Sequence, residues 1–217
     1  MKTLVVSDEM ERTLFSEQTP HLFKDIDLII SCGDLPYYYL EYIEDAINAP
    51  LLFVHGNHDP IVEYWERGER TSPMGAVNLH QKVISFNKFI FAGFEGSIKY
   101  RNSDRMYTQM QMWIKVIKII PFLLWNKLMH GRFLDVLVTH APPAGIHELK
   151  DFPHTGFKAF RWIIETFKPA IHFHGHVGNF FQRNNETIFS DTCIINIYGH
   201  KVVQIDTKRM MNSERVL

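Results

Sequence analysis

Polar side chains that can bind a divalent metal follow five apolar runs of the sequence. They are, in chain order, Asp8, Asp34, Asn57, His140 and His176. Carboxylate, amide and imidazole groups suit Mn, Fe, Zn or Ni, and the sequence has no cluster of thiolates. Each residue alone has an ordinary explanation, since an Asp after a strand is commonly a turn or helix cap. Their recurrence at the ends of apolar runs favours one shared metal site.

The segment Gly56-Asn57-His58-Asp59 is the most informative of the five, because every residue type in it suits a metal-dependent reaction. Glycine permits a tight turn, Asn57 offers a neutral oxygen to a cation, and His58 can serve as a ligand or a proton donor. Asp59 fits two roles equally well, the orientation of His58 and the capping of its own turn. We therefore treat His58 as the candidate catalytic residue and Asp59 as its candidate neighbour.

Three predicted strands near the N-terminus place these side chains at one edge of a sheet. They cover residues 3–7, 27–32 and 51–54, each a short apolar run. A helix over residues 37–47 joins the second strand to the third, opened by Pro36 and with an apolar face formed by Tyr39, Ile43 and Ile47. This unit makes the strands parallel, so their carboxyl ends meet at the edge where α/β proteins bind ligands.

The remainder of the chain supplies a second set of strands. Residues 60–75 are loop-like, and helices are predicted over about 104–130 and 156–167. Strands are predicted over residues 82–86, 88–92, 134–139, 170–173, 187–189, 193–197 and 201–205. We expect a second sheet to begin near residue 82. The predicted strand over 134–139 delivers His140, and the one over 170–173 delivers His174-Gly175-His176.

Composition describes a globular chain. The 217 residues are 46% hydrophobic and 22% charged, and we expect one domain over residues 1–217. The net charge is −1, which indicates no basic face for nucleic acid. Cys32 and Cys193 lie in apolar runs, which favours free thiols in a reducing compartment. The first strand begins at about Lys2, so we expect no signal peptide and a cytoplasmic location.

The order of these residues resembles the calcineurin-like metallophosphoesterase superfamily, over about residues 2–205. The most specific parts are Gly56-Asn57-His58-Asp59 and Thr139-His140-Ala141-Pro142-Pro143. The matching order is completed by Asp8, Gly33-Asp34 and Gly175-His176. The resemblance implies an α/β fold, namely a four-layer α/β/β/α sandwich of two mixed β-sheets flanked by helices, with metals at one edge.

The resemblance also implies a role for each matched residue. Asp34 would bridge two metals, and Asp8 would belong to the first of them. The second metal would be held, besides Asp34, by Asn57, His140 and His176. His58 would lie over the substrate phosphate as a general acid or a stabiliser of developing charge. Mn²⁺ is the expected ion, with Fe, Zn or Ni as alternatives.

Two positions depart from the family's pattern. Where the family has Asp-x-His and Gly-His-x-His, this chain has Met10 and Gly178. A thioether is a soft donor and glycine offers only backbone, so we expect the second metal to be firmly bound and the first to be weakly held or absent. Glu9 and His174 are the nearby candidates for a supporting role, although alternation along an extended segment turns both away from the metals. We expect His174 to orient a ligand or contact phosphate.

The predicted helix over 104–130, an insertion into the domain, is the main clue to a partner. Asp104 is its expected N-cap, and Pro121 is expected to kink or split it. An apolar stripe is formed by Met106, Met110, Trp113, Ile117, Ile120, Leu124 and Leu128. The stripe favours packing on the sheet or a homodimer contact, and the sharper alternative is an amphipathic cap on a membrane surface or an acyl chain. Lys115 and Lys118 argue against a transmembrane span.

Two functions are consistent with these residues. The first is a metal-dependent phosphoesterase that hydrolyses a phosphate monoester or diester, with a nucleotide or a lipid pyrophosphate among its candidate substrates, by attack of a metal-activated hydroxide. The second is a metal-binding interaction module that keeps the fold and hydrolyses little, which Met10 and Gly178 support. The presence of His58 favours the enzyme, because a scaffold needs no acid over the phosphate.

Overall fold

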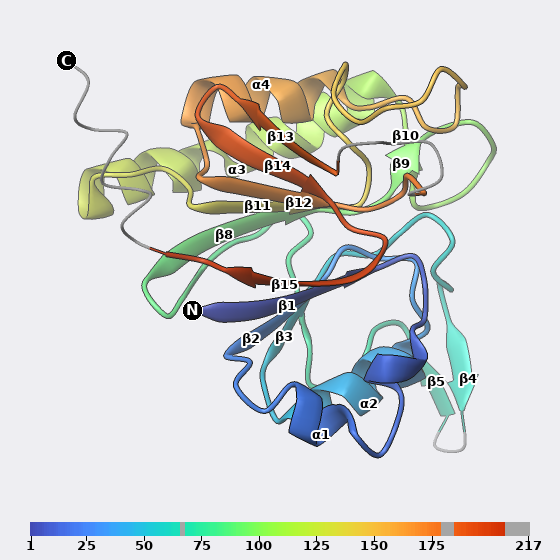
Figure 1. Cartoon of the computed structure of the whole chain (residues 1–217). Helices are drawn as coiled ribbons and strands as arrows, with labels where there is room; N and C mark the ends of the chain where they lie inside the picture. Colours follow the sequence, from blue (N-terminus) through green and yellow to red (C-terminus); the bar gives the residue numbers. More distant parts are fainter. Residues whose placement is uncertain (66–67, 179–184, 207–217) are drawn as a thin grey trace.

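A five-stranded mixed sheet holds the N-terminal part of the chain. The computed structural model describes residues 1–65, 68–178 and 185–206. The order of the strands in this sheet is β15-β1-β2-β3-β6 (Figure 1). Their bounds are Gly199–Gln204, Lys2–Ser7, Leu28–Ser31, Leu51–Phe53 and Val77–Asn78. Strands β1, β2, β3 and β6 are parallel, and β15 returns antiparallel to β1. The carboxyl ends of β1, β2 and β3 therefore share one edge, as predicted.

A six-stranded mixed sheet packs against the first. Its order is β13-β14-β12-β11-β8-β7. The bounds are Glu186–Phe189, Thr192–Asn196, Ile171–His174, Val136–Thr139, Phe89–Phe94 and Val83–Phe86. The four central strands are parallel, and the edge strands β13 and β7 are antiparallel to their neighbours. The expected start of a second sheet near residue 82 is confirmed.

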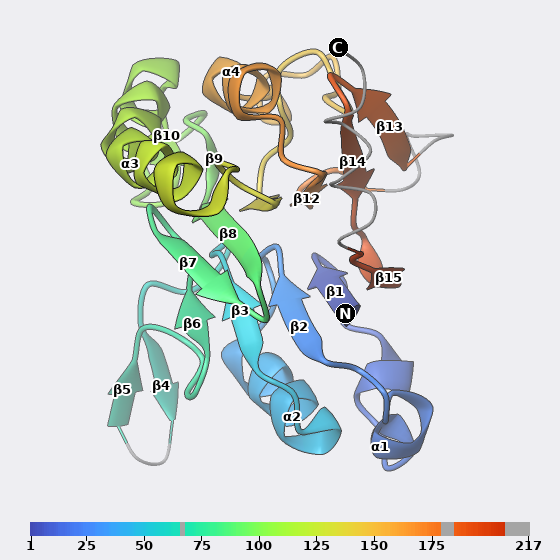
Figure 2. The same ribbon diagram turned by 90° about the vertical axis from the view of Figure 1, so that its left-hand side faces the viewer.

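Helices cover the outer face of each sheet (Figures 1 and 2). Helices α1 and α2 lie on the five-stranded sheet, after a short 3-10 turn η1, and α3 and α4 lie on the six-stranded sheet. Their bounds are Arg12–Leu14 for η1, Thr19–Leu22 for α1, Tyr37–Ile47 for α2, Gln109–His130 for α3 and Lys158–Phe167 for α4. This arrangement is the four-layer α/β/β/α sandwich that the family resemblance implies.

Three apolar cores hold the four layers together. One strand can contribute to two cores because its side chains alternate between the faces of the sheet. In β1, Val5 faces the other sheet, whereas Leu4 and Val6 face the helices. The inner core also contains Val138 and Phe173 from the six-stranded sheet. Parallel strands that are buried on both faces must be apolar at nearly every position, which explains the continuous apolar runs in the sequence.

The start of helix α3 corrects the prediction of a helix from residue 104. Met106–Tyr107 form the short strand β10, which pairs in parallel with β9 at Ser97–Ile98. The N-cap is Thr108 instead of Asp104. The Thr108 side chain accepts a hydrogen bond from the Gln111 N–H at 3.2 Å, and the Gln111 side chain accepts one from the Thr108 N–H at 2.8 Å. This reciprocal capping box satisfies two donors that Asp104 lies too early to reach.

The centre of α3 also differs from the prediction. Pro121 lies inside the helix without splitting it. Pro121 and Ile117 are exposed, so the Ile117 carbonyl that loses its helical donor can bond to water instead. The face that packs on the molecule consists of Met112, Val116, Ile119 and Leu123. Most of the predicted stripe points to solvent, namely Met110, Ile117, Leu124 and Leu128.

Two smaller features complete the fold. The expected loop over residues 60–75 contains a hairpin of β4 (Glu63–Trp65) and β5 (Gly68–Arg70). The buried Arg70 guanidinium pairs there with Glu41 and, at 2.6 Å, with Glu63. These short polar strands have no apolar pattern that sequence analysis could detect. Cys32 and Cys193 are both buried and form no disulfide.

The capping box of α3 yields a stability prediction. Thr108→Ala removes the acceptor for the Gln111 N–H, and we expect the free energy of unfolding to fall by about 1 kcal/mol. Urea unfolding followed by circular dichroism measures the change. Thr71→Ala is the matched control, because Thr71 is exposed and lies outside any helix. Equal losses in the two variants would show that the cap does not stabilise the helix.

Candidate metal centre

Three candidate ligands meet where the carboxyl edges of the two sheets come together. Asp34 follows β2 of one sheet, whereas His140 and His176 follow β11 and β12 of the other. One ligand atom from each lies within 4.8 Å of the others, the one such group among the residues that the structure describes. Asp34 Oδ2 is 3.3 Å from His140 Nε2, and the imidazole centroids of His140 and His176 are 4.8 Å apart. These separations suit three ligands of a single ion.

His140 is the central residue of this group and is fully buried. Its Nδ1 donates to the Cys32 carbonyl at 2.8 Å, which leaves Nε2 for the ion. Nε2 lies 3.0 Å from Asn57 Oδ1 as well as near Asp34. Because both ring nitrogens face oxygen atoms, both carry protons in the metal-free protein. A cation at this position would replace the Nε2 proton, so the donor set fits a divalent metal.

The pKa values of the three candidate ligands agree with a protonated His140 beside an ionised Asp34. Burial by itself lowers the pKa of His140, but the adjacent Asp34 and Asp8 carboxylates outweigh it and raise that pKa to about 9. Burial raises the pKa of Asp34, but the positive His140 outweighs it and lowers that pKa to about 2. Burial and the positive His140 lower the pKa of His176 to about 3, so its ring is neutral and able to bind metal.

Close backbone contacts bring the ligand loops together. A Cβ on Gly56 would lie 1.9 Å from Asp34 Oδ1, and a Cβ on Gly175 would lie 2.0 Å from Ser7 Oγ. Only glycine permits these approaches. Asp34 and His176 themselves adopt left-handed backbone conformations, with φ of 58° and 69°. Such conformations cost about 1–3 kcal/mol each and concentrate at functional sites.

Asp8 lies beside the three-ligand group but is not one of its members. Its Oδ2 accepts hydrogen bonds from Ser7 Oγ at 2.6 Å and from the His176 N–H at 2.9 Å. Burial, with help from the Asp34 charge, raises the pKa of Asp8 to about 6, although the positive His140 opposes the rise. The assignment of Asp8 to a first metal remains a prediction.

The two departures from the family's pattern add no ligand. Met10 is 49% exposed, and its sulfur accepts a hydrogen bond from the Tyr38 hydroxyl at 3.4 Å. A Cβ on Gly178 would lie 3.7 Å from Tyr198 Cε2, so a side chain there would pack on the phenol ring. Burial and the charges of Glu9 and Asp8 raise the pKa of Tyr198. Neither position therefore offers an imidazole to the side of the centre next to Asp8.

The turn after β3 positions His58 and Asn57. The His58 N–H donates to Asp34 Oδ1 at 2.7 Å, which ties this turn to the ligand carboxylate, while the imidazole of His58 is exposed. Asp59 accepts from the Gly56 N–H at 2.8 Å and from the Leu35 N–H at 3.1 Å. Of the two roles open to Asp59, the structure supports the capping of its own turn.

The match with known proteins agrees with this geometry. The family model described as calcineurin-like phosphoesterase matches residues 7–200. The chain belongs to the calcineurin-like phosphoesterase family. Membership implies binding of a divalent metal and, in general terms, hydrolysis of phosphoesters. No curated protein gives a significant match in sequence.

Solved structures with the same fold are distant in sequence. The protein TT1561 of Thermus thermophilus is 12% identical, with 94% of this chain and 99% of that chain covered and a TM-score of 0.59. GAP50 of Plasmodium, described as the anchor in the inner membrane complex, is 12% identical, with 91% and 71% covered and a TM-score of 0.50. At these identities the likeness supports the fold alone.

Two further residues with predicted supporting roles lie near the phosphoesterase centre. Glu9 is exposed, and its charge acts on Tyr198. His174 is buried and bonds to the Gly175 carbonyl at 3.0 Å and to His147 at 2.9 Å. Neither of these two partners of His174 is a predicted metal ligand. Its expected contact with a ligand or phosphate stays a prediction.

A loop between β9 and β10 contributes residues that sequence analysis missed. Buried Arg105 donates to the carbonyls of Asp59 at 2.8 Å and Pro60 at 2.7 Å, which fastens this loop to the His58 turn. Arg101 Nη2 then lies 3.5 Å from His58 Nδ1, and the Tyr100 hydroxyl lies 3.5 Å from Asn57 Nδ2. No pattern in the sequence links this loop to the His58 turn.

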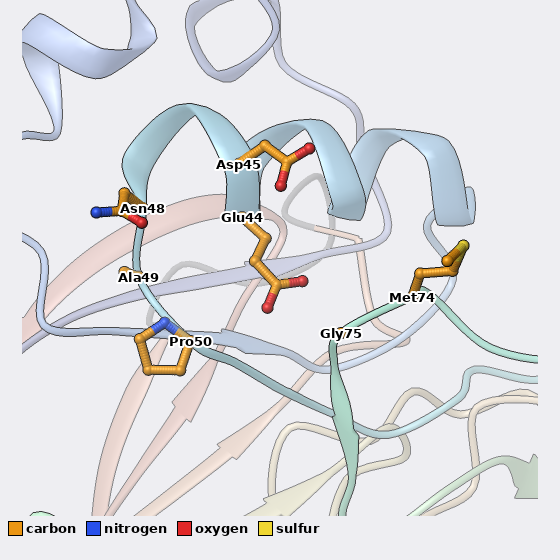
Figure 3. Close-up of a pocket in the computed structure, with 7 residues that line it drawn as sticks. All are labelled: Glu44, Asp45, Asn48, Ala49, Pro50, Met74 and Gly75. Carbon is orange, nitrogen blue, oxygen red and sulfur yellow. The ribbon is translucent and has the colours of Figure 1, made fainter.

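A surface pocket of about 360 Å³ lies elsewhere (Figure 3). Its lining consists of Glu44, Asp45, Asn48, Ala49, Pro50, Met74 and Gly75. Helix α2 ends and β3 begins at this pocket, so it lies at the amino edge of the sheet, opposite the metal centre. Burial and the adjacent Asp45 raise the pKa of Glu44 to about 7. The pocket contributes nothing to the phosphoesterase site.

The charge balance of the centre yields a metal-binding prediction. His140 keeps its proton up to a pKa of about 9, so binding of Mn²⁺ at neutral pH must displace that proton. Calorimetric titration at pH 7 in buffers of different ionisation enthalpy should show release of about one proton per ion. Because the metal competes with the proton, affinity should rise with pH up to about 9 and then level off.

Substitution of His140 tests whether this residue is a metal ligand. His140→Ala should weaken Mn²⁺ binding at least about 100-fold, since it removes a ligand. His21→Ala is the matched control, because His21 is exposed and lies in α1 on the far layer. Proton release near zero at pH 7, or unchanged affinity in His140→Ala, would contradict the assignment.

Proposed function

We propose that this member of the family is a metal-dependent phosphoesterase that hydrolyses a phosphate monoester or diester. The observation that carries the proposal is the group formed by Asp34, His140 and His176, with exposed His58 anchored beside it. When bound, a divalent ion held by these three residues and Asn57 supplies a Lewis acid and lowers the pKa of water. Mn²⁺ is the ion that we expect.

His58 acts in this proposal as the general acid. Its backbone bond to Asp34 Oδ1 holds it at the ligand carboxylate, and its exposed ring is accessible to a substrate. A proton from this imidazole to the leaving oxygen neutralises the charge that develops as the ester bond breaks. Asp59 bonds to the Gly56 and Leu35 N–H groups and does not lie behind His58.

Arg101 lies beside His58 and supplies a second positive charge. Its guanidinium lies against His58 and stacks over the Tyr100 ring at 5.6 Å. A guanidinium binds two phosphoryl oxygens at once, which suits a site where few ligands are available for a second ion. We assign Arg101 to substrate phosphate binding and Arg105 to holding its loop in place.

A binding module with little hydrolysis is the second candidate. The specific observation in its favour is the phenol of Tyr198 beside Gly178, together with Met10 bonded to Tyr38. These residues supply no imidazole on the Asp8 side of the centre. The exposed His58 and Arg101 are the features that such a module would not require.

The role of His58 can be tested by hydrolysis of p-nitrophenyl phosphate and bis-p-nitrophenyl phosphate with Mn²⁺. His58→Ala should lower kcat by about 10²–10⁴-fold, the usual contribution of a general acid, and leave metal binding unchanged. His21→Ala is the matched control. Absence of turnover by the wild-type protein with one bound ion would favour the binding module, and equal rates in both variants would remove His58 from the mechanism.

The role of Arg101 predicts a different kinetic signature. Arg101→Ala should raise KM and lower kcat/KM by about tenfold or more, because a charged hydrogen bond to phosphate is lost. Arg101→Lys should recover part of the loss, since it keeps the charge without the planar fork. Lys99→Ala, an exposed cation of the same loop, should change neither parameter. Unchanged KM in Arg101→Ala would show that the guanidinium does not bind substrate.

A further inference from the structure

Helix α3 is apolar on two opposite faces. One face, formed by Met112, Val116, Ile119 and Leu123, packs on the molecule. The other is exposed, from 49% at Ile114 to 76% at Leu128. This outer face of α3 consists of Met110, Ile114, Ile117, Phe122, Leu124, Trp125, Leu128 and Met129. A helix that is apolar all round is normally covered on both sides.

The position of α3 leaves its outer face open. The helix lies in the outermost layer, and Figure 2 shows it at the upper left edge of the molecule beside α4. The contact with α4 uses a different part of its surface, where Trp113 and Trp162 lie 5.4 Å apart. Eight large apolar side chains on one exposed face exceed the scattered exposure normal for a surface and mark an interaction site.

The charge on α3 indicates which kind of partner binds its outer face. The sequence has no Asp or Glu between Arg105 and Leu134. Lys118 is exposed within the outer face. The Lys127 ammonium bonds to the neutral Gly131 carbonyl and lies over the Phe133 ring, so neither contact cancels its charge. Arg132 is neutralised by Asp135 and adds nothing. The outer face is therefore apolar and cationic, and it fits an apolar surface of negative charge.

A second copy of the chain fits this face poorly. A two-fold contact through the helix would place the same patch against itself, so that Lys118 and Lys127 would meet cations and no carboxylate. A lipid bilayer has no such conflict, because lysine extends its ammonium to the headgroups while its stem stays in the apolar zone. Trp125 is an aromatic type that gathers at that boundary, and Phe122 suits the apolar face of a helix lying there.

We propose that the outer face of α3 docks this protein on the surface of a membrane containing anionic lipids. The helix would lie in the plane of the interface, with the apolar side chains in the acyl boundary and the lysines at the headgroups. No helix in the described ranges is long and apolar enough to cross a membrane, which agrees with a helix that lies flat. This docking goes beyond the proposed hydrolysis and requires no metal or substrate.

Sedimentation with lipid vesicles tests the proposal. The full chain should bind vesicles of mixed phosphatidylglycerol and phosphatidylcholine, and more weakly those of phosphatidylcholine alone. Leu124→Ser/Trp125→Ser/Leu128→Ser should lower the partition coefficient by about a hundredfold or more, since each of the three apolar side chains contributes about tenfold when buried. Lys118→Glu reverses one charge and should lower it by about thirtyfold at low salt and less at high salt.

Matched variants on the far layer serve as controls. Leu22→Ser removes an exposed apolar side chain from α1, and Lys24→Glu reverses an exposed charge near it. Both should bind vesicles as the wild type does, and thermal unfolding checks that all variants are folded. Three outcomes would overturn the proposal: no binding to anionic vesicles, equal binding to neutral ones, or a dimer in light scattering that the triple variant dissociates without vesicle binding.

Discussion

The hydrogen bond from His140 to the Cys32 carbonyl joins the two sheets at the edge where the candidate ligands lie. His140 ends a strand of one sheet and Cys32 ends a strand of the other, so this 2.8 Å contact sets how closely the edges approach. The bond from the His176 N–H to Asp8 repeats the connection one strand further along. Without the inner apolar core neither bond could form, because the two edges would separate.

The inner part of the fold was predictable because its physics is local and repetitive. Strands buried on both faces must be apolar at nearly every position, and a parallel sheet places their carboxyl ends together. Asp34, His140 and His176 could therefore be grouped from the sequence alone, and the structure brings them within reach of one ion. The layer order was predicted from the resemblance, since no local pattern tells which sheet a strand joins.

Predictions failed where two arrangements satisfy the same pattern. Helix α3 carries two interleaved apolar stripes, and spacing alone cannot tell which one faces the sheet. Thr108 and Asp104 are both acceptable N-caps, and the reciprocal bonds with Gln111 decide between them. Arg101 was missed for another reason, because its position depends on a contact between Arg105 and a turn distant in sequence.

On the Asp8 side of the centre, the local charge favours binding of a cation, whereas the small number of ligands opposes it. Two partly buried carboxylates, Asp8 and Asp34, face a single protonated imidazole. Burial, with a smaller contribution from the Asp34 charge, raises the pKa of Asp8 although the positive His140 opposes the rise. Added positive charge would therefore be favourable. Ligands to hold it are scarce, because one oxygen of Asp8 already accepts two hydrogen bonds and neither Met10 nor Gly178 offers an imidazole. A cation at this side would depend on electrostatic attraction and water more than on coordination by the chain.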